Sequence, residues 1–171
     1  MTSGDVQMCD ESEAPRVVMS KSAEETRAWG ARLGVALRAG DVVRLEGELG
    51  AGKTTLVQGV IRALGSTARV TSPTFTLVNE YRTARGLTVY HSDAYRLGLR
   101  PVNEQAVDTL GLGDMLNDGG VLLVEWSEYV AALLPGDGLT VHIIYGAGDD
   151  ERTLRLEGSG VRGRELAASI A

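Results

Sequence analysis

The chain has 171 residues, of which 43% are hydrophobic, and a formal net charge of -6. This length suits one domain, because a single core commonly serves about 100–200 residues and two domains would each be thinly filled. The negative charge argues against tight binding of RNA or DNA by the chain alone, since such binding relies on basic side chains that displace counterions from phosphates.

Cys9 is the sole cysteine, so neither a disulfide nor a cysteine-ligated metal can form within one chain. No positively charged segment precedes an apolar run at the N-terminus, and no apolar run approaches the roughly 18 residues of a membrane span. These features predict a protein of the reducing cytoplasm that has no contact with a membrane.

Residues 1–14 are polar and acidic, with little to bury, and we expect a disordered tail that is dispensable for chemistry. Residues 15–171 are expected to form the single domain. Its first element is a short strand over residues 16–19.

The first helix is predicted from Ser22 onwards, because Ser22 and Glu25 have the spacing of a capping box. Gly40 is expected to end this helix. Apolar residues repeat along it every four positions, at Trp29, Leu33 and Leu37.

Residues 47–54, with the sequence GELGAGKT, fit the phosphate-binding loop G-x-x-x-x-G-K-[ST]. The loop lies between a predicted strand at 42–45 and a predicted helix at 55–64, which is the context this motif requires. Its glycines let backbone N–H groups approach phosphates, Lys53 adds a compact charge, and the Thr54 hydroxyl can ligate magnesium. Lysine is otherwise found only at position 21, in a chain rich in arginine.

The rest of the chain interleaves strand and helix patterns. We predict hairpins from strands at 75–81 and 87–93 and at 139–145 and 152–156, a buried strand at 121–124, and helices at 102–110 and 162–168. This order predicts a three-layer α/β fold of the P-loop NTPase type, with a central, mostly parallel sheet and hairpin additions. The phosphate loop should lie at the carboxyl end of a central strand.

Two carboxylates follow predicted strands and are candidates for a magnesium–nucleotide site, namely Glu125 and Asp93. Glu125 ends an uninterrupted aliphatic strand, which favours a metal-holding or water-ordering role over a solvent-exposed carboxylate. Asp93 could instead cap the segment that follows it. Trp126 could stack on or cover the nucleotide, or simply pack against neighbouring side chains.

Two further features remain open. The segment Ser72-Pro73-Thr74 could sense the γ-phosphate or could be a turn before a strand. His91 should share a face with Asp93 by strand alternation, and it could be a hydrogen-bonded structural residue or could orient groups near the site, either being commoner for a lone strand histidine than catalysis.

Four blocks taken together resemble the TsaE family, also called YjeE, of small bacterial ATPases required for threonylcarbamoyladenosine in tRNA. The blocks are GELGAGKTT at 47–55, SPTFTLVNEY at 72–81, HSDAYRL at 91–97 and EWSE at 125–128. They occur in the family's order, and the likeness covers most of the chain. Ser127 departs from the pattern, because the family often has proline at this position.

The resemblance implies an ATP site with Mg²⁺. Thr54 and Glu125 would hold the metal, Asp93 would act near the metal or the attacking water, and Lys53 would serve catalysis. The loop residues that would cradle ATP are Gly50, Ala51, Gly52, Lys53, Thr54 and Thr55.

The resemblance also implies contacts at the far end of the nucleotide. Trp126 would lie by the nucleotide, Thr26 would lie near the adenine, and Glu128 and Arg152 would join it there. The family works with TsaD and TsaB, which transfer the threonylcarbamoyl group, while TsaE hydrolyses ATP to let the complex turn over. The chain would then meet tRNA only through that complex.

The alternative from the residues alone is a kinase for a small metabolite, with Arg82 and Arg85 as candidate lid residues. A GTP-dependent switch is excluded, because its guanine-reading Asn-Lys-x-Asp needs a lysine where this chain has none.

Overall fold

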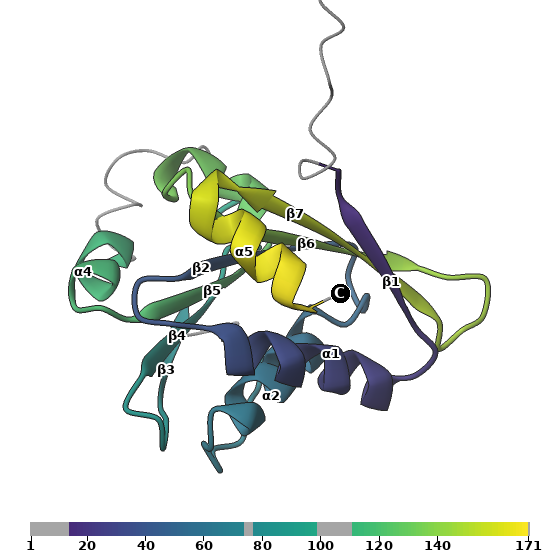
Figure 1. The fold of residues 1–171 in the computed structure, drawn as a ribbon, viewed down its shortest axis with the longest axis horizontal. Helices are drawn as coiled ribbons and strands as arrows, with labels where there is room; N and C mark the ends of the chain where they lie inside the picture. The colour runs from purple at the N-terminus through teal and green to yellow at the C-terminus, as the bar shows by residue number, and fades with distance from the viewer. Residues whose placement is uncertain (1–13, 74–76, 99–110, 171) are drawn as a thin grey trace, which may run out of the picture.

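The computed structural model describes residues 14–73, 77–98 and 111–170. In this part of the chain, seven strands form one sheet in the order β1-β7-β6-β2-β5-β4-β3 (Figure 1). The strands are β1 (Arg16–Ser20), β2 (Val42–Glu46), β3 (Val78–Arg82), β4 (Thr88–Asp93), β5 (Val121–Glu125), β6 (Gly138–Tyr145) and β7 (Arg152–Ser159). The helices are α1 (Ala23–Ala36), α2 (Lys53–Ala63), α4 (Leu112–Asn117) and α5 (Gly160–Ile170), with 3₁₀ helices η2 (Ser127–Tyr129) and η3 (Ala131–Leu133).

The centre of the sheet is parallel and its edges are antiparallel. Strands β4, β5, β2 and β6 run parallel to one another. Strand β3 pairs antiparallel with β4, β7 with β6, and β1 with β7. The predicted α/β fold class, including both hairpins, is therefore confirmed.

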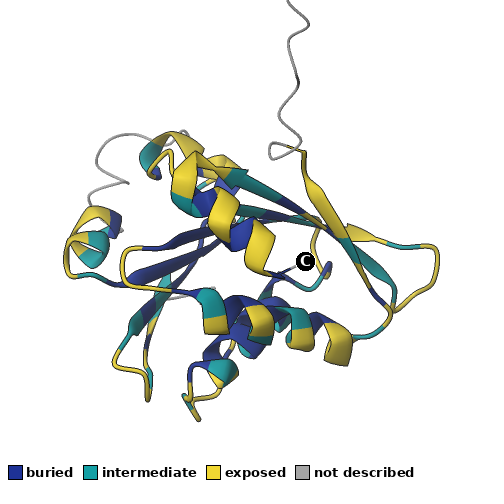
Figure 2. Ribbon diagram, viewed as in Figure 1, coloured by how far each residue is buried: buried dark blue, intermediate teal, exposed yellow. Residues whose placement is uncertain are grey.

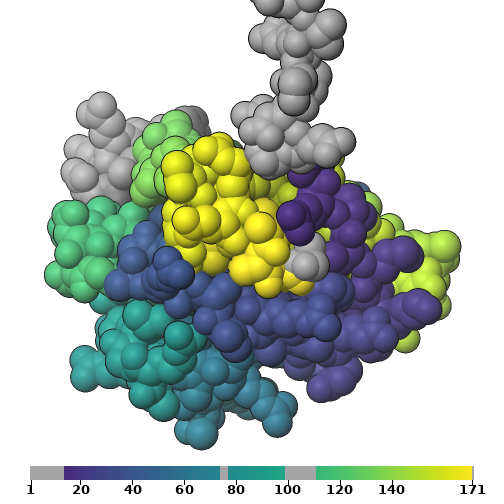
Figure 3. Space-filling model, viewed as in Figure 1, coloured from purple at the N-terminus to yellow at the C-terminus, as the bar shows by residue number. Residues whose placement is uncertain are grey.

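Helices cover the two faces of the sheet unequally. On one face, α1, α2 and α5 pack over the odd-numbered side chains of β2, β5 and β6 and form the main core. On the other face, α4, η2 and η3 cover a smaller cluster around Leu122 and Val124. Figure 2 shows buried strands in the centre and exposed outer faces on α1 and α5. Figure 3 shows α5, in yellow, lying directly against α1 on the surface.

Two glycines let α1 and α2 approach closely. A Cβ atom on Gly30 would overlap the carbonyl of Leu56, and one on Gly59 would overlap the carbonyl of Arg27. Because any larger residue would force the helices apart, these positions fix how α2, and with it the phosphate loop, lies against α1.

The boundaries of α1 differ from the predictions in detail. The Ser22 hydroxyl caps the N–H of Glu25 at 3.2 Å, but the Glu25 carboxylate accepts from the N–H of Lys21, at 2.7 Å, and not from that of Ser22. The helix ends at Ala36, and Gly40 lies in the following turn with φ +85°. The Asp41 carboxylate accepts the N–H of Arg38 at 2.7 Å and so draws the chain into this turn before β2.

Other predicted boundaries shift by a few residues. Helix α2 begins at Lys53, inside the predicted loop, and α4 was not predicted. The helix predicted at 102–110, Thr74, the start of the strand predicted at 75–81, and almost all of the predicted tail lie outside the described residues. None of the helices in the described ranges is long and apolar enough to cross a bilayer.

Candidate nucleotide site

The phosphate loop joins β2 to α2 and folds around the ammonium group of Lys53. Gly52 precedes α2 with φ +112°, a conformation that favours glycine. The Lys53 Nζ donates to the carbonyls of Gly47 at 2.6 Å and Glu48 at 3.0 Å. It also lies 3.7 Å from the centre of the Trp126 ring. Burial lowers the pKa of Lys53, and the charge of Glu125 opposes that shift.

Glu125 lies at the carboxyl end of β5, directly beside β2 and β4. Its Oε1 atom accepts the hydroxyl of Thr54 at 2.7 Å and lies 2.8 Å from Nε2 of His91. Glu125 and His91 are buried, 3% and 0% exposed. Since a carboxylate only accepts, the ring nitrogen facing it carries the proton. His91 therefore holds the side chain of Glu125 in place.

Asp93 ends β4 and pairs in register with Glu125 across the sheet. Its Oδ2 accepts the hydroxyl of Ser72 at 2.5 Å, and its Oδ1 accepts the N–H of Tyr95 at 2.9 Å. The two candidate carboxylates are thus neighbours, and each is held by further hydrogen bonds. Ser72, which was open between a sensing role and a turn, contacts one of them directly.

A cavity of about 380 Å³ unites these groups, bordered by the phosphate loop on one side and by Asp93, Glu125 and Trp126 on the other. Trp126 has φ +57°. Its ring packs against Tyr95 at a tilt, with ring centres 4.9 Å apart, and stacks on Tyr129 with ring centres 6.0 Å apart. Ser127, the departure from the family pattern, donates its hydroxyl to Glu46 at 3.1 Å. A proline there would lose this bond.

The remaining sequence candidates lie in two other places. Thr26 and Arg152 border a cleft of about 190 Å³ that also contacts Gly50, Ala51, Gly52 and Thr55 of the loop. Glu128 instead borders a separate cavity of about 380 Å³ with Glu46 and His142. Burial raises the pKa of Glu128. The structure therefore brings Thr26 and Arg152 together and does not bring Glu128 to them.

Two contacts that brace the phosphate loop were not expected from the sequence. The Tyr145 hydroxyl donates to the carbonyl of Leu49 at 2.7 Å, and Nε of Arg152 donates to the carbonyl of Ala51 at 2.9 Å. The Arg152 guanidinium also lies 4.4 Å from the centre of the Tyr145 ring. Because both acceptors are backbone carbonyls, no pattern of residue types signals these contacts.

The chemistry of the site suits a magnesium ion held largely by its substrate. Among the described residues, no group of three or more His, Cys, Asp or Glu side chains could form a metal site of its own. Mg²⁺ commonly takes one or two protein oxygens and completes its shell with phosphates and water. The hydroxyl of Thr54 and the carboxylate of Glu125, already in contact, are such a donor pair.

Comparison with known proteins gives concordant results. The model of the family described as threonylcarbamoyl adenosine biosynthesis protein TsaE matches residues 20–154. A tRNA threonylcarbamoyladenosine biosynthesis protein TsaE of Bacillus subtilis is 39% identical over 148 residues, covering 86% of this chain and 89% of that protein. One from Streptomyces coelicolor is 42% identical over 132 residues, covering 75% and 85%. The crystal structure of Bacillus subtilis YdiB has a TM-score of 0.75 and 34% identity, covering 91% of this chain and 93% of that one.

Proposed function

Since the chain belongs to the TsaE family of tRNA threonylcarbamoyladenosine biosynthesis, we propose that it is a magnesium-dependent ATPase that acts in the cytoplasm with TsaD and TsaB. One observation carries this proposal. A single cavity joins the phosphate loop, with Lys53 and Thr54, to the strand-end carboxylates Asp93 and Glu125. These are the groups that phosphoryl transfer to water requires.

Lys53 is the group that changes partners when ATP binds. Its ammonium now contacts two loop carbonyls and the face of Trp126. Phosphate oxygens are stronger acceptors than carbonyls, because they are charged. We expect Lys53 to exchange its carbonyl contacts for phosphate oxygens, while the loop N–H groups and the start of α2 bind the remaining oxygens.

Thr54 and Glu125 would hold Mg²⁺, which neutralises charge on the β- and γ-phosphates when bound. Asp93 is fixed by Ser72 and the N–H of Tyr95, so it can orient the attacking water and accept its proton. Water then forms a bond to the γ-phosphorus as the bond to the β,γ-bridging oxygen breaks, and ADP and phosphate leave. Thr26 and Arg152 would contact the adenine side, and this role is supported by the cleft that they border together with residues of the loop.

The alternative of a metabolite kinase is less well supported. Its proposed lid residues are engaged elsewhere: Arg82 bonds Glu80 at 3.2 Å, and Arg85 donates to the carbonyls of Gly34 and Val35. Neither borders the nucleotide cavity.

Steady-state hydrolysis and complex assembly, measured together, test the proposal. The isolated chain should hydrolyse ATP slowly, and TsaD with TsaB should raise the rate. Because linkage is reciprocal, ATP should also tighten assembly of the complex. Rapid phosphoryl transfer to a small metabolite by the isolated chain would support the kinase instead. The proposal would be contradicted if the rate of ATP turnover did not depend on the concentration of TsaD–TsaB and assembly of the complex did not depend on the concentration of ATP.

A further inference from the structure

A cleft of about 660 Å³ runs along α2 beside the nucleotide cavity. One wall is α2 itself, and the other is the segment 66–72 that follows it. The cleft and the nucleotide cavity share Thr54 and Ser72. Neither the ATP site nor the proposed hydrolysis uses the rest of this cleft.

The charge of the cleft is opposite to that of the chain. Its lining includes Arg27, Arg62 and Arg69 and no carboxylate, although the net charge of the chain is -6. Arg27 pairs with Glu24 at 2.9 Å. The side chains of Arg62 and Arg69 make no ion pair or hydrogen bond with any described residue. Two guanidinium groups are thus available to an anionic ligand, and each can bind a carboxylate through two hydrogen bonds.

The cleft is connected mechanically to the nucleotide site. Thr54, Gln58 and Arg62 recur every four residues and so share one face of α2. The Gln58 side chain accepts from Arg27 at 3.3 Å and donates to the carbonyl of Val70 at 3.3 Å, joining both helices to the returning segment. That segment ends at Ser72, which bonds Asp93.

We propose that this arginine cleft binds a carboxylate-bearing segment of a partner protein and reports the nucleotide state to it. The proposal rests on the proposed function and names the surface and chemistry of its partner contact. A change at Thr54 or Asp93 on hydrolysis reaches the cleft through α2 and Ser72, so the partner's affinity depends on the nucleotide. A protein segment fits better than a nucleic acid, because Glu24 and Glu25 flank Arg27 and Arg62 in the adjoining groove and would repel a long phosphate backbone.

The test compares two variants with the same change in charge, Arg62→Glu/Arg69→Glu and the control Arg16→Glu/Arg82→Glu, whose arginines lie outside the cleft. An octaglutamate peptide serves as the direct probe, titrated against the full chain by calorimetry. Association with the TsaD–TsaB pair is measured in parallel, with and without ATP. Binding of ADP and the unfolding temperature, measured for each variant, show that the fold and nucleotide site are intact.

The cleft variant should lose octaglutamate binding and associate with TsaD–TsaB at least about 20-fold more weakly, while the control stays close to wild type. If wild type and cleft variant associate equally well with TsaD–TsaB, the proposed role of the cleft is wrong, while the proposed function is not contradicted. Octaglutamate binding that the cleft variant loses, with no association of wild type with TsaD–TsaB, would support the cleft and contradict the proposed function. If a single-stranded oligonucleotide binds wild type more tightly than octaglutamate and the cleft variant loses it, the ligand is a nucleic acid and the proposal is wrong.

Discussion

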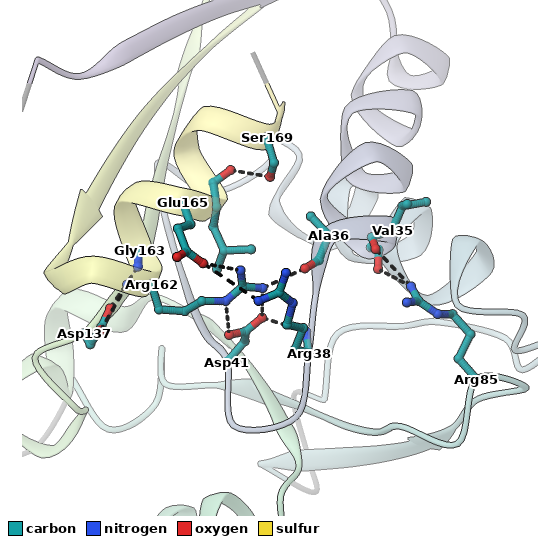
Figure 4. A network of polar contacts seen from close by, with 12 residues as sticks. Val35, Ala36, Arg38, Asp41, Arg85, Asp137, Arg162, Gly163, Glu165 and Ser169 are labelled. Carbon is teal, nitrogen blue, oxygen red and sulfur yellow. Dashed lines mark hydrogen bonds and ion pairs between the residues drawn. The ribbon is translucent and has the colours of Figure 1, made fainter. Parts of the chain in front are cut away.

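Two polar clusters lie at opposite ends of β2 and differ in how fully their charges are paired. Before β2, Asp41 receives two hydrogen bonds from Arg162, both at 2.8 Å (Figure 4). Arg162 also bonds the carbonyl of Ala36 at 2.7 Å and the carboxylate of Glu165 at 3.0 Å. The hydrogen bonds that Arg162 donates to Asp41 raise the pKa of Arg162.

After β2, at the nucleotide site, pairing is incomplete. The Nδ1 of His91, whose ring contacts Glu125, is buried without a hydrogen-bond partner within the described residues. Lys53 forms no ion pair in the described ranges, and burial lowers its pKa. The pKa of Arg162 is therefore raised and that of Lys53 is lowered. The paired cluster stabilises the fold, whereas the nucleotide end keeps a buried charge that a phosphate ligand would satisfy, as is common in functional sites.

Replacement of Lys53 should have the largest effect on activity and little on stability. We expect Lys53→Ala to weaken ATP binding and to lower turnover by about 10²–10³-fold, because the variant lacks the positive charge that would contact the phosphates. Its free energy of unfolding should stay equal to that of wild type or rise, since a buried unpaired cation is removed. Calorimetry with ATP, a hydrolysis assay and urea unfolding measure the three quantities. Unchanged ATP affinity and turnover would refute the assignment of this site.

Glu125 should affect turnover far more than affinity. Under our proposal that Glu125 holds the metal, Glu125→Ala should lower turnover by about 10²-fold and change ATP affinity only slightly. Asp114→Ala, an exposed carboxylate on α4, is the control. An equal loss in affinity and turnover would mean that Glu125 serves ground-state binding.

Much of this fold could be predicted from the sequence. The aliphatic run at 121–124 and the motif at 47–54 have local patterns that fix a buried strand and a strand-loop-helix unit. The end of α1 could not be predicted, because it depends on Asp41 and on packing that brings α5 against the turn. Tertiary contacts of this kind override the signal of a glycine such as Gly40.

The candidate site likewise has residues that could be predicted from the sequence and contacts that could not. Lys53, Thr54, Asp93 and Glu125 follow from a motif and from strand ends, and the sheet brings them together because parallel strands end at one edge. The braces from Tyr145 and Arg152 bind backbone carbonyls, and the open arginine cleft depends on the path of segment 66–72 after α2. Neither leaves a local pattern of residue types.

The paired cluster should respond in the opposite way from Lys53. Asp41 is only 4% exposed, so Asp41→Ala leaves Arg162 without its buried carboxylate partner, with only the more exposed Glu165, and should lower the free energy of unfolding by about 2–3 kcal/mol. ATP affinity should not change. Urea unfolding with a double-mutant cycle against Arg162→Ala measures the coupling. A coupling near zero would show that this cluster resembles an exposed ion pair.

The smallest effect is expected at Asp137, which holds the start of α5 beside the paired cluster. Its carboxylate accepts the N–H of Gly163 at 2.8 Å and that of Arg162 at 3.3 Å. The bond from Gly163 lowers the pKa of Asp137, so the folded state favours the charged carboxylate.

A carboxyl whose pKa is lower in the folded state stabilises the fold at pH values above its unfolded pKa of about 3.9. This stabilisation is lost as the pH falls through the folded pKa. Asn keeps an acceptor oxygen and loses only the charge, which solvent screens, so Asp137→Asn should lower the free energy of unfolding by roughly 0.3–0.5 kcal/mol at pH 7 and by less near pH 3. High salt should also narrow the difference, because the carboxylate is exposed. If wild type and variant differ in free energy of unfolding by the same amount at both pH values, the effect comes from hydrogen-bond geometry alone and the charge of Asp137 does not contribute.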